Sequence, residues 1–412
     1  MNDAGAHIET VRSARDVARI RNLPSVARLV FAMTAQIRFG SLTVIMPDGR
    51  AFRFAGEELG HEGTIRIVRM RTFRRLLTGG NIGFAEAYLD GDWECEDVAG
   101  FLDAVSRNTE QLRGYFRATF WPRLANRVRH AWNANTRSGA RRNIHAHYDL
   151  GNAFYERWLD KSMTYSAARF SHPGEALLQA QRNKYRALAE RIGLAPGHHV
   201  LEIGSGWGGF AEFAAKEIGA RVTGITISKE QRDYAQARMA AEGLTERVTI
   251  EMRDYRDVEG QFDRIASIEM FEAVGEKYWP AYFGKLRECL KPGGIAGLQV
   301  ITIGESHFPI YRRGVDFIQK YIFPGGMLPT MSALRREIER AGLEWRDDSA
   351  FGHDYAKTLA RWRESFLAAW EEIRPLGFDE RFKRLWTYYL SYCEAGFRSG
   401  STDVVQIAAQ RV

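Results

Sequence analysis

The sequence predicts an α/β protein in which a doubly wound, Rossmann-like sheet follows a smaller α+β domain. Three observations support this fold class. Strands and helices alternate from residue 143 onward, a glycine-dense turn joins one of these strands to a helix, and the chain of 412 residues is too long for one typical domain. A hydrophobic content of 45% is sufficient for two cores.

The second part of the chain has the alternation that a parallel sheet requires. We expect strands over 199–203, 221–227, 247–252, 262–267 and 295–303, and helices over 175–192, 229–242 and 279–290, with another helix ending at 218. Parallel strands need crossover connections, so this repetition favours a doubly wound sheet. The aromatic-rich C-terminal part, which includes Trp362 and Trp386, is predicted to be helical and to pack on the same domain.

The first 105 residues predict a domain of their own. Strands are expected over 42–46, 51–54 and 63–68, with a hairpin turn at 47–50. A helix is expected from Thr72 to about Leu77, ending at Gly79 and Gly80. The predicted domains are therefore an accessory domain (1–105), a basic connector (106–142) and the large α/β domain (143–412).

The formal net charge of +7 is unevenly spread along the chain, and positive charge is concentrated in the connector. It contains one acid, Glu110, against Arg107, Arg113, Arg117, Arg123, Arg127, Arg129, Arg137, Arg141 and Arg142. Aromatic residues such as Trp121 and Trp132 are interleaved with these arginines. This composition is typical of a helix on an anionic membrane surface, and a solvated linker helix or an RNA contact are the alternatives.

Targeting and metal signals are not evident in the sequence. The N-terminus lacks a signal-peptide pattern, and no apolar stretch is long enough to span a bilayer. Three separated cysteines form neither a disulfide framework nor a zinc site. His145, His147 and His353 lack partners at ligand spacing, so we expect no metal site. The absence of signal, spanning and disulfide patterns predicts a cytoplasmic protein that is soluble or peripheral to the membrane.

The glycine-dense turn follows an apolar strand and precedes a helix. Gly204, Gly206 and Gly208 are spaced more tightly than in dinucleotide sites, and Glu202 lies inside the strand end. Such a turn directs backbone N–H groups at a ligand. The arrangement suits S-adenosylmethionine, and the alternative is an ordinary strand–helix turn.

Six segments in order resemble the cyclopropane fatty acid synthase family. They are His147–Tyr155, Met163–Ser166, Gly224–Gln231, Arg253–Asp257, Met270–Gly275 and Tyr321–Gly326. The resemblance covers about residues 143–400, and extends more loosely to Thr72–Trp93. It implies a class I methyltransferase domain, a lipid-associated accessory domain, and S-adenosylmethionine-dependent chemistry on unsaturated acyl chains.

The resemblance also assigns a cofactor site. Glu202, Gly204 and Gly206 are expected at the methionine end. Thr226 and Gln231 take the place of the acid that usually binds the ribose. Asp254 and Tyr255 are expected at the adenine, and Tyr165 and Ser166 on the methionine side. The alternative for each is a turn or capping role, as Ser228 would have at a helix N-terminus.

On the lipid side, methyl transfer to an alkene makes a carbocation, which needs a dry pocket with π faces or a carboxylate nearby. Candidates for the lining are Tyr278, Tyr282, Tyr321 and Phe323, for which core packing is the alternative. A base must then remove a proton. Its loss from the new methyl closes a cyclopropane, and its loss from a chain carbon leaves a methyl-branched alkene.

In the family, the base is a bicarbonate held by a glutamate, a tyrosine, a cysteine and a histidine. On this chain the resemblance places the glutamate on Glu272 and the tyrosine on Tyr355, while the cysteine and histidine positions hold Ala167 and Gln299. Gln299 can still donate a hydrogen bond, but neither replacement can shuttle a proton. Glu269 lies three residues before Glu272, so both could face one cavity if the segment is helical.

The sequence thus predicts a peripheral enzyme on the inner face of the cytoplasmic membrane. Its expected partners are S-adenosylmethionine, bicarbonate, unsaturated acyl chains and an anionic phospholipid surface, with no nucleic acid. The expected product is a cyclopropane fatty acyl chain, with a methyl-branched unsaturated chain as the alternative. A non-catalytic lipid-binding protein and an RNA methyltransferase are the alternatives of other classes, and a homodimer is left open.

Overall fold

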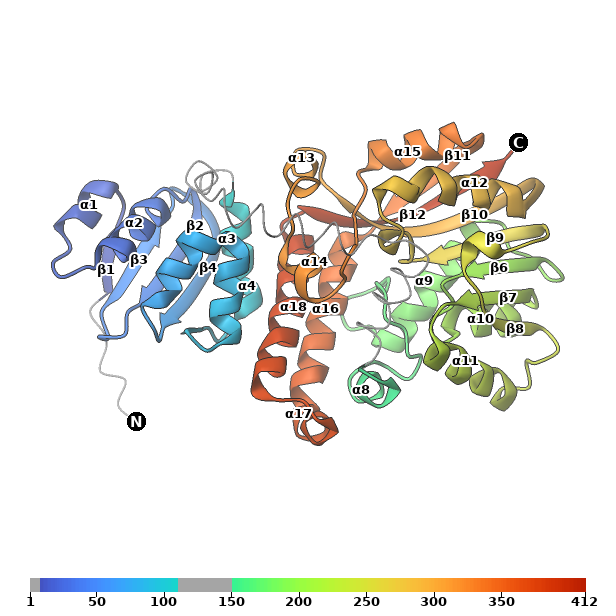
Figure 1. Cartoon of the computed structure of the whole chain (residues 1–412), viewed down its shortest axis with the longest axis horizontal. Coiled ribbons are helices and arrows are strands. Elements are labelled where there is room, and N and C mark those ends of the chain that lie inside the picture. Colours follow the sequence, from blue (N-terminus) through green and yellow to red (C-terminus); the bar gives the residue numbers. More distant parts are fainter. Residues whose placement is uncertain (1–7, 110–149) are drawn as a thin grey trace. The chain divides into compact units, whose positions relative to one another are not determined.

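The computed structural model describes residues 8–109 and 150–412, which form two compact units (Figure 1). Of the described residues, the first unit contains 8–109, 314–318 and 377–401. The second contains residues 150–313, 319–376 and 402–412. Most of the basic connector, with its aromatic residues, lies outside the described residues.

The second unit is built on a seven-stranded sheet with the order β11-β12-β10-β9-β6-β7-β8. Its strands are β6 (His199–Ile203), β7 (Arg221–Thr226), β8 (Val248–Met252), β9 (Phe262–Ile268), β10 (Leu290–Ile303), β11 (Leu343–Ala350) and β12 (Thr402–Arg411). The strands β6 to β10 pair in parallel, and β12 runs antiparallel to both β10 and β11. The doubly wound, Rossmann-like sheet is therefore confirmed, as are its five predicted strands.

Helices cover both faces of this sheet (Figure 1). The helices are α8 (Asn152–Glu156), α9 (Leu177–Arg191), α10 (Gly209–Phe213), α11 (Lys229–Ala241), α12 (Trp279–Cys289), α13 (Phe308–Tyr311), α15 (Met331–Arg340), α16 (Gly352–Ala368) and α17 (Trp370–Ile373). The short helix α14 (Phe317–Tyr321) crosses the boundary between the units, and α10 continues into a π-helical turn, Ala214–Ile218. Alternate residues of β6 belong to two cores: Leu201 packs with α12 and α15, and Val200 packs with α9 to α11.

The prediction of a wholly helical C-terminal part was wrong for β11 and β12. Residues 404–409 of β12 are buried as one continuous run, because this strand lies between β10 and β11 in the sheet. A short buried run without alternation does not distinguish a strand from a buried helix.

The first unit contains a five-stranded sheet with the order β1-β3-β2-β4-β5. Its strands are β1 (Ile8–Val11), β2 (Phe39–Ile45), β3 (Ala51–Ala55), β4 (Glu58–Ile67) and β5 (Trp93–Glu94), and its helices are α1 (Ala14–Arg19), α2 (Ser25–Thr34), α3 (Arg71–Leu89), α4 (Val98–Arg107) and α18 (Glu380–Arg398). The predicted end of a helical segment near Gly80 is confirmed. Gly80 adopts φ 58° and ψ −142°, which are not helical, and α3 continues beyond this kink as a second helical segment.

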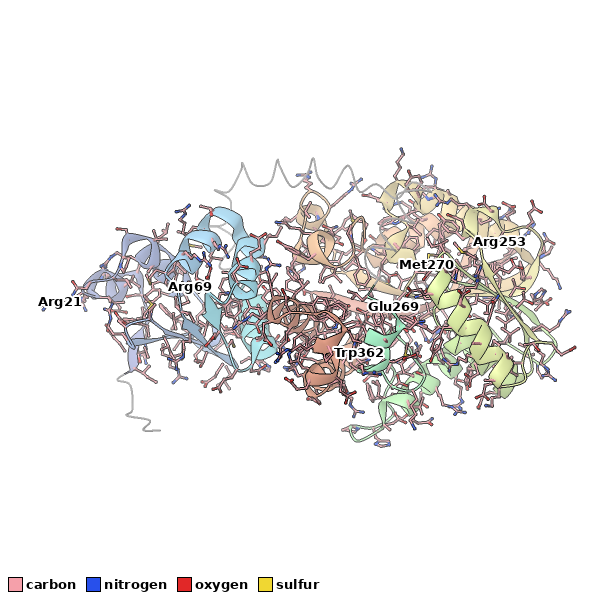
Figure 2. All side chains as sticks on the ribbon, turned by 60° about the horizontal axis from the view of Figure 1, so that its bottom comes forward. Arg21, Arg69, Arg253, Glu269, Met270 and Trp362 are labelled. Atoms are coloured by element: carbon pink, nitrogen blue, oxygen red, sulfur yellow. The ribbon has the colours of Figure 1, made fainter. Side chains whose placement is uncertain are left out.

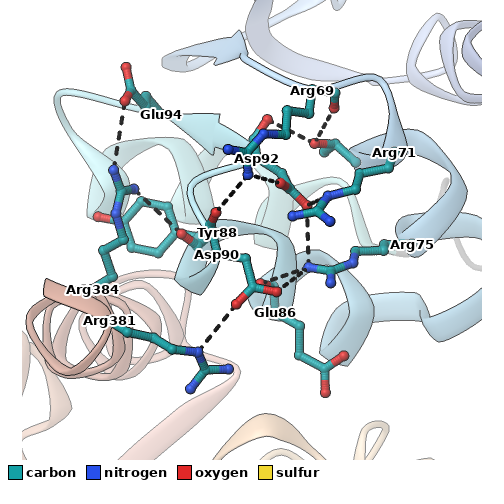
Figure 3. Close-up of polar contacts among 11 residues, drawn as sticks. Arg69, Arg71, Arg75, Glu86, Tyr88, Asp90, Asp92, Glu94, Arg381 and Arg384 are labelled. Atoms are coloured by element: carbon teal, nitrogen blue, oxygen red, sulfur yellow. Dashed lines mark hydrogen bonds and ion pairs between the residues drawn. The ribbon is translucent and has the colours of Figure 1, made fainter. Parts of the chain in front are cut away.

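The helix α18 belongs to the first unit, whereas the sequence analysis placed it with the α/β domain. Acidic residues of the α3–β5 turn bind arginines at the start of α3 and an arginine of α18 (Figure 3). Asp92 accepts from Arg69 and Arg71, and Asp90 accepts from Arg381 of α18. The rings of Tyr88 and Tyr388 pack with centroids 5.6 Å apart. These tertiary contacts between distant segments leave no local signal in the sequence.

Candidate active site

The carboxyl end of β6 forms the glycine turn predicted from the sequence. Gly204, Gly206 and Gly208 all have positive φ angles, of 84°, 51° and 84°. A Cβ atom on Gly204 would lie 2.8 Å from Cγ of Met270, so only glycine fits there. A Cβ atom on Gly206 would meet no atom within 4 Å, which makes this part of the turn open to a ligand.

Two buried polar atoms beside this turn lack a hydrogen-bond partner. They are Oε2 of Glu202 and Oγ of Ser205. Burial raises the pKa of Glu202 to about 8. Buried polar groups are normally paired, so these atoms mark a place for a ligand. A carboxyl acceptor and an open backbone turn fit the amino-acid end of S-adenosylmethionine.

The predicted ribose residues lie together at the end of β7. Oγ1 of Thr226 donates to Oε1 of Gln231 over 2.9 Å, and both residues are buried. Ser228 caps α11 by accepting from the Gln231 N–H, as its alternative role in the sequence analysis anticipated. The cap and the side-chain bond together hold the amide of Gln231 at the edge of the sheet.

Asp254 follows the end of β8 as predicted, but its carboxylate already has strong partners. Both of its oxygens accept from the Arg256 guanidinium, over 2.8 and 2.6 Å, and it also caps the 3-10 turn Tyr255–Asp257. This supports the capping alternative, and adenine recognition by Asp254 stays a prediction. Tyr255 is partly buried with its ring 5.4 Å from that of Tyr282.

Tyr165 and Ser166 lie in a segment that is held by hydrogen bonds from side chains of α9. Oγ of Ser166 accepts from Nζ of Lys184 over 2.7 Å, and its carbonyl accepts from the Gln181 amide over 2.9 Å. The Tyr165 ring packs against Trp362, with centroids 5.1 Å apart. The segment begins at Met163, one of the few non-glycine residues described with a positive φ.

The predicted catalytic positions meet on Glu269, although the sequence analysis selected Glu272. Oε2 of Glu269 accepts from the Tyr355 hydroxyl over 2.6 Å. Oε1 accepts from the Gln299 amide and from the Ala167 backbone N–H, both over 2.8 Å. Figure 2 labels Glu269 beside Met270, directly after β9.

Glu272 lies on a neighbouring element, the 3-10 turn Phe271–Ala273. Its Oε1 accepts from the Ile301 backbone N–H over 2.5 Å, and its buried Oε2 has no hydrogen-bond partner. Burial, followed by the negative charge of Glu269, raises the pKa of Glu272 to about 8. The two carboxyl groups interact as expected, but not through the helical i,i+3 spacing that was considered.

Two residues behind Glu269 were missed in the sequence analysis. Gln406, on the unpredicted strand β12, donates to Oε1 of Gln299 over 3.1 Å and so orients that amide towards Glu269. Lys184 is fully buried on α9, and its charge lowers the pKa of Glu269 against the larger effect of burial. A fully buried lysine shows no signal in a helical pattern that otherwise looks amphipathic.

Comparison with known proteins shows the family. The family model described as mycolic acid cyclopropane synthetase matches residues 135–407. This chain belongs to that family. It is 42% identical over 342 residues to the tuberculostearic acid methyltransferase UfaA1 of Mycobacterium tuberculosis, covering 81% of this chain and 79% of the relative. It is 39% identical to the cyclopropane-fatty-acyl-phospholipid synthase of Escherichia coli, covering 89% and 95%.

Solved structures agree with this membership of the cyclopropane synthetase family. The mycolic acid cyclopropane synthase CmaA1, complexed with SAH and CTAB, superposes with a TM-score of 0.62 at 30% identity, covering 66% of this chain and 98% of that one. MmaA2 from Mycobacterium tuberculosis gives the same TM-score at 27% identity and the same coverage. The chain is therefore an S-adenosylmethionine-dependent methyltransferase of class I fold.

In this synthetase-family chain, the four aromatic candidates for the lipid pocket differ in burial. Tyr282 is fully buried in the core, and its hydroxyl donates to Ser267 over 2.9 Å, which supports its packing alternative. Tyr278 is partly buried against the same core. Tyr321 and Phe323 are also partly buried. The segment that contains them continues to Met327, whose backbone N–H donates to the Glu272 carbonyl over 2.9 Å.

No helix among residues 8–109 and 150–412 combines the length and apolar character needed to cross a membrane.

Proposed function

We propose that this enzyme transfers the methyl carbon of S-adenosylmethionine to a cis double bond in a phospholipid acyl chain and forms a cyclopropane. The observation that carries the proposal is the position of the Glu269–Tyr355 pair. This pair lies at the carboxyl end of the sheet that also carries the glycine turn, where Met270 packs against Gly204. The identity to the E. coli phospholipid synthase supports the substrate class.

The chemistry explains why a base is needed. The alkene π electrons form a bond to the methyl carbon, and the C–S bond electrons stay on sulfur. The cation left in the chain then loses a proton. If the proton leaves the new methyl, its C–H electrons close the ring. The buried Glu269 carboxylate can stabilise the cation, because a dry site strengthens the attraction.

A second product, a methyl-branched unsaturated chain, has specific support. Ala167 and Gln299 replace the cysteine and histidine expected from the cyclopropane-forming members. UfaA1, at 42% identity, is named as a tuberculostearic acid methyltransferase. Both products share the methyl transfer and differ only in which carbon loses the proton.

The test uses the purified full chain with labelled S-adenosylmethionine and vesicles of cis-monounsaturated phospholipid. Mass spectrometry of the released acyl chains is expected to show one added carbon. The two products have equal mass, so fragmentation or hydrogenation must separate them. Glu246→Gln, at an exposed turn, is the control variant. If binding of S-adenosylmethionine is absent in calorimetry, a non-catalytic lipid-binding protein replaces the proposal.

We further propose that the enzyme works on an anionic membrane surface at the inner face of the cytoplasmic membrane. The net charge of +7 and the arginine-rich stretch 107–142, which lies largely outside the described residues, support this location. Replacing Arg123, Arg127 and Arg129 together is expected to weaken vesicle binding most at low salt. Retention on RNA without pelleting on anionic vesicles would favour the nucleic-acid alternative.

A further inference from the structure

We propose that the Glu269 carboxylate is the resident base of this enzyme and replaces a bound bicarbonate. This inference rests on the proposed function, because a base is required only if a methylated cation forms.

The hydrogen-bond donors expected to hold a bicarbonate are already directed at Glu269. Tyr355 donates to Oε2 over 2.6 Å, while Gln299 and the Ala167 N–H donate to Oε1, each over 2.8 Å. The Ile301 N–H, a further donor nearby, is bound to Glu272 over 2.5 Å. A bicarbonate would find these donors engaged and would lie against two carboxyl groups, so the residues present do not fit it.

The same contacts suit Glu269 to act as a base. Three donors from three separate segments fix both carboxylate oxygens, which prepares the group before substrate arrives. Oε2 has one donor and Oε1 has two, so Oε2 is the oxygen with more capacity to accept a proton. Burial raises the pKa of Glu269, which brings the carboxylate closer to the working pH of a base.

Glu272 and Lys184 place the negative charge on Glu269. Glu272, with a pKa of about 8, is protonated at neutral pH. Two adjacent carboxyl groups rarely ionise together, and the one with donors and a nearby cation keeps the charge. The charge of Lys184 lowers the pKa of Glu269, although burial lowers the pKa of Lys184 itself to about 7.

The step balances without another reactant. After methyl transfer, Oε2 of Glu269 takes a proton from the new methyl carbon. The electrons of that C–H bond form the last bond of the cyclopropane and neutralise the cation. The proton stays on the Glu269 carboxyl group and passes to water after the product leaves.

The backbone offers a clean variant for testing. Glu269 has φ 49°, a conformation that glycine adopts without strain. Glu269→Gly therefore removes the carboxylate and leaves space for a small carboxylate from solution. Glu269→Gln keeps the volume and serves as a second variant if the glycine variant folds poorly. Glu246→Gln is the matched surface control.

The experiment measures methyl transfer to acyl chains in buffer depleted of CO₂, and again with bicarbonate or formate added. We expect the wild type to be unaffected by depletion. Both Glu269 variants should lose at least about 100-fold in turnover and keep their affinity for S-adenosylmethionine. Bicarbonate or formate should restore the glycine variant at least about tenfold, which loss of a structural contact would not permit.

Several outcomes would overturn the inference. The first is a wild-type rate that falls on CO₂ depletion, and the second is a Glu269→Gln variant that keeps its turnover. The third is a folded Glu269→Gly variant whose turnover neither bicarbonate nor formate restores. If the wild type forms no methylated acyl chain under any condition, the proposed function fails instead, and the two failures are therefore distinguishable.

Discussion

Nζ of the fully buried Lys184 lies 2.7 Å from Oγ of Ser166, which joins helix α9 to the segment expected at the methionine end of the cofactor. Burial lowers the pKa of Lys184 to about 7, while the charges of Glu269, Asp160 and Glu202 oppose that effect. Lys184 therefore has two effects that can be measured. Its hydrogen bond positions Ser166, and its charge lowers the pKa of Glu269.

Lys184→Met should lower turnover roughly tenfold, because a buried hydrogen bond to Ser166 is lost. It should also move the acidic limb of the pH–rate profile to higher pH, since the positive charge that lowers the pKa of Glu269 is gone. Steady-state rates across the pH range test this, with the exposed Lys161→Met as the control. A lower rate with an unmoved limb would show a purely structural role.

Tyr355→Phe removes one of the three donors on Glu269 and leaves the ring in place. A hydrogen bond to a charged group contributes about 1.5–3 kcal/mol, so turnover should fall by roughly 10–100-fold. Affinity for S-adenosylmethionine, measured by calorimetry, should not change. The variant Tyr234→Phe on α11 provides the comparison, and equal turnover in the two variants would refute the role of Tyr355.

Glu272→Gln should change the pH dependence of stability. The pKa of this carboxyl group is about 8 in the folded chain against an ordinary value of 4.5, so the folded state binds an extra proton between these values. Stability therefore falls as pH rises through this window, by up to about 1.4 kcal/mol per pH unit for one group. Urea unfolding between pH 5 and 7 should show a shallower slope in the variant.

The same variant should keep its affinity for S-adenosylmethionine. Part of the stability slope will remain, because Glu202 also has a raised pKa of about 8. A slope identical to that of the wild type would mean that Glu272 is already charged in the folded chain at pH 5.

Gly204→Ala should abolish cofactor binding and destabilise the chain more than Gly243→Ala does. Both glycines have a positive φ, which costs an alanine about 1–2 kcal/mol. Only at Gly204 would the new Cβ also lie 2.8 Å from the Met270 side chain, while at Gly243 no atom lies within 4 Å. Thermal unfolding and calorimetry of the two variants separate strain from steric overlap.

Strands β6 to β10 could be predicted because each contains a run rich in apolar residues, and α-helices follow β6, β7 and β10. The same reasoning failed for β12, whose pairing partners lie about 60 and 110 residues earlier in the chain. It failed also for α18, which packs with α3 and α4 through contacts that no local pattern encodes.

The sequence indicated most of the residues that lie at the site, but not which of them contact one another. The glycine turn, Thr226, Gln231, Gln299 and Tyr355 all lie at the carboxyl edge of the sheet or against it. The choice between Glu269 and Glu272 could not be made from their spacing, because β9 ends between Ile268 and Glu269 and the two side chains leave different elements. Only the tertiary fold shows that Tyr355, Gln299 and Ala167 meet on Glu269.

Transfer of the methyl carbon to lipid can be followed by mass spectrometry after the full chain is incubated with cis-monounsaturated phospholipid vesicles and S-adenosylmethionine that carries a fully deuterated methyl group. We expect acyl chains with one added carbon that keeps two of its three deuterons, because Glu269 removes the third during ring closure. An added carbon that keeps all three would show loss of a chain proton and a methyl-branched alkene. Acyl chains without deuterium, in a protein that binds the cofactor, would contradict methyl transfer to lipid altogether.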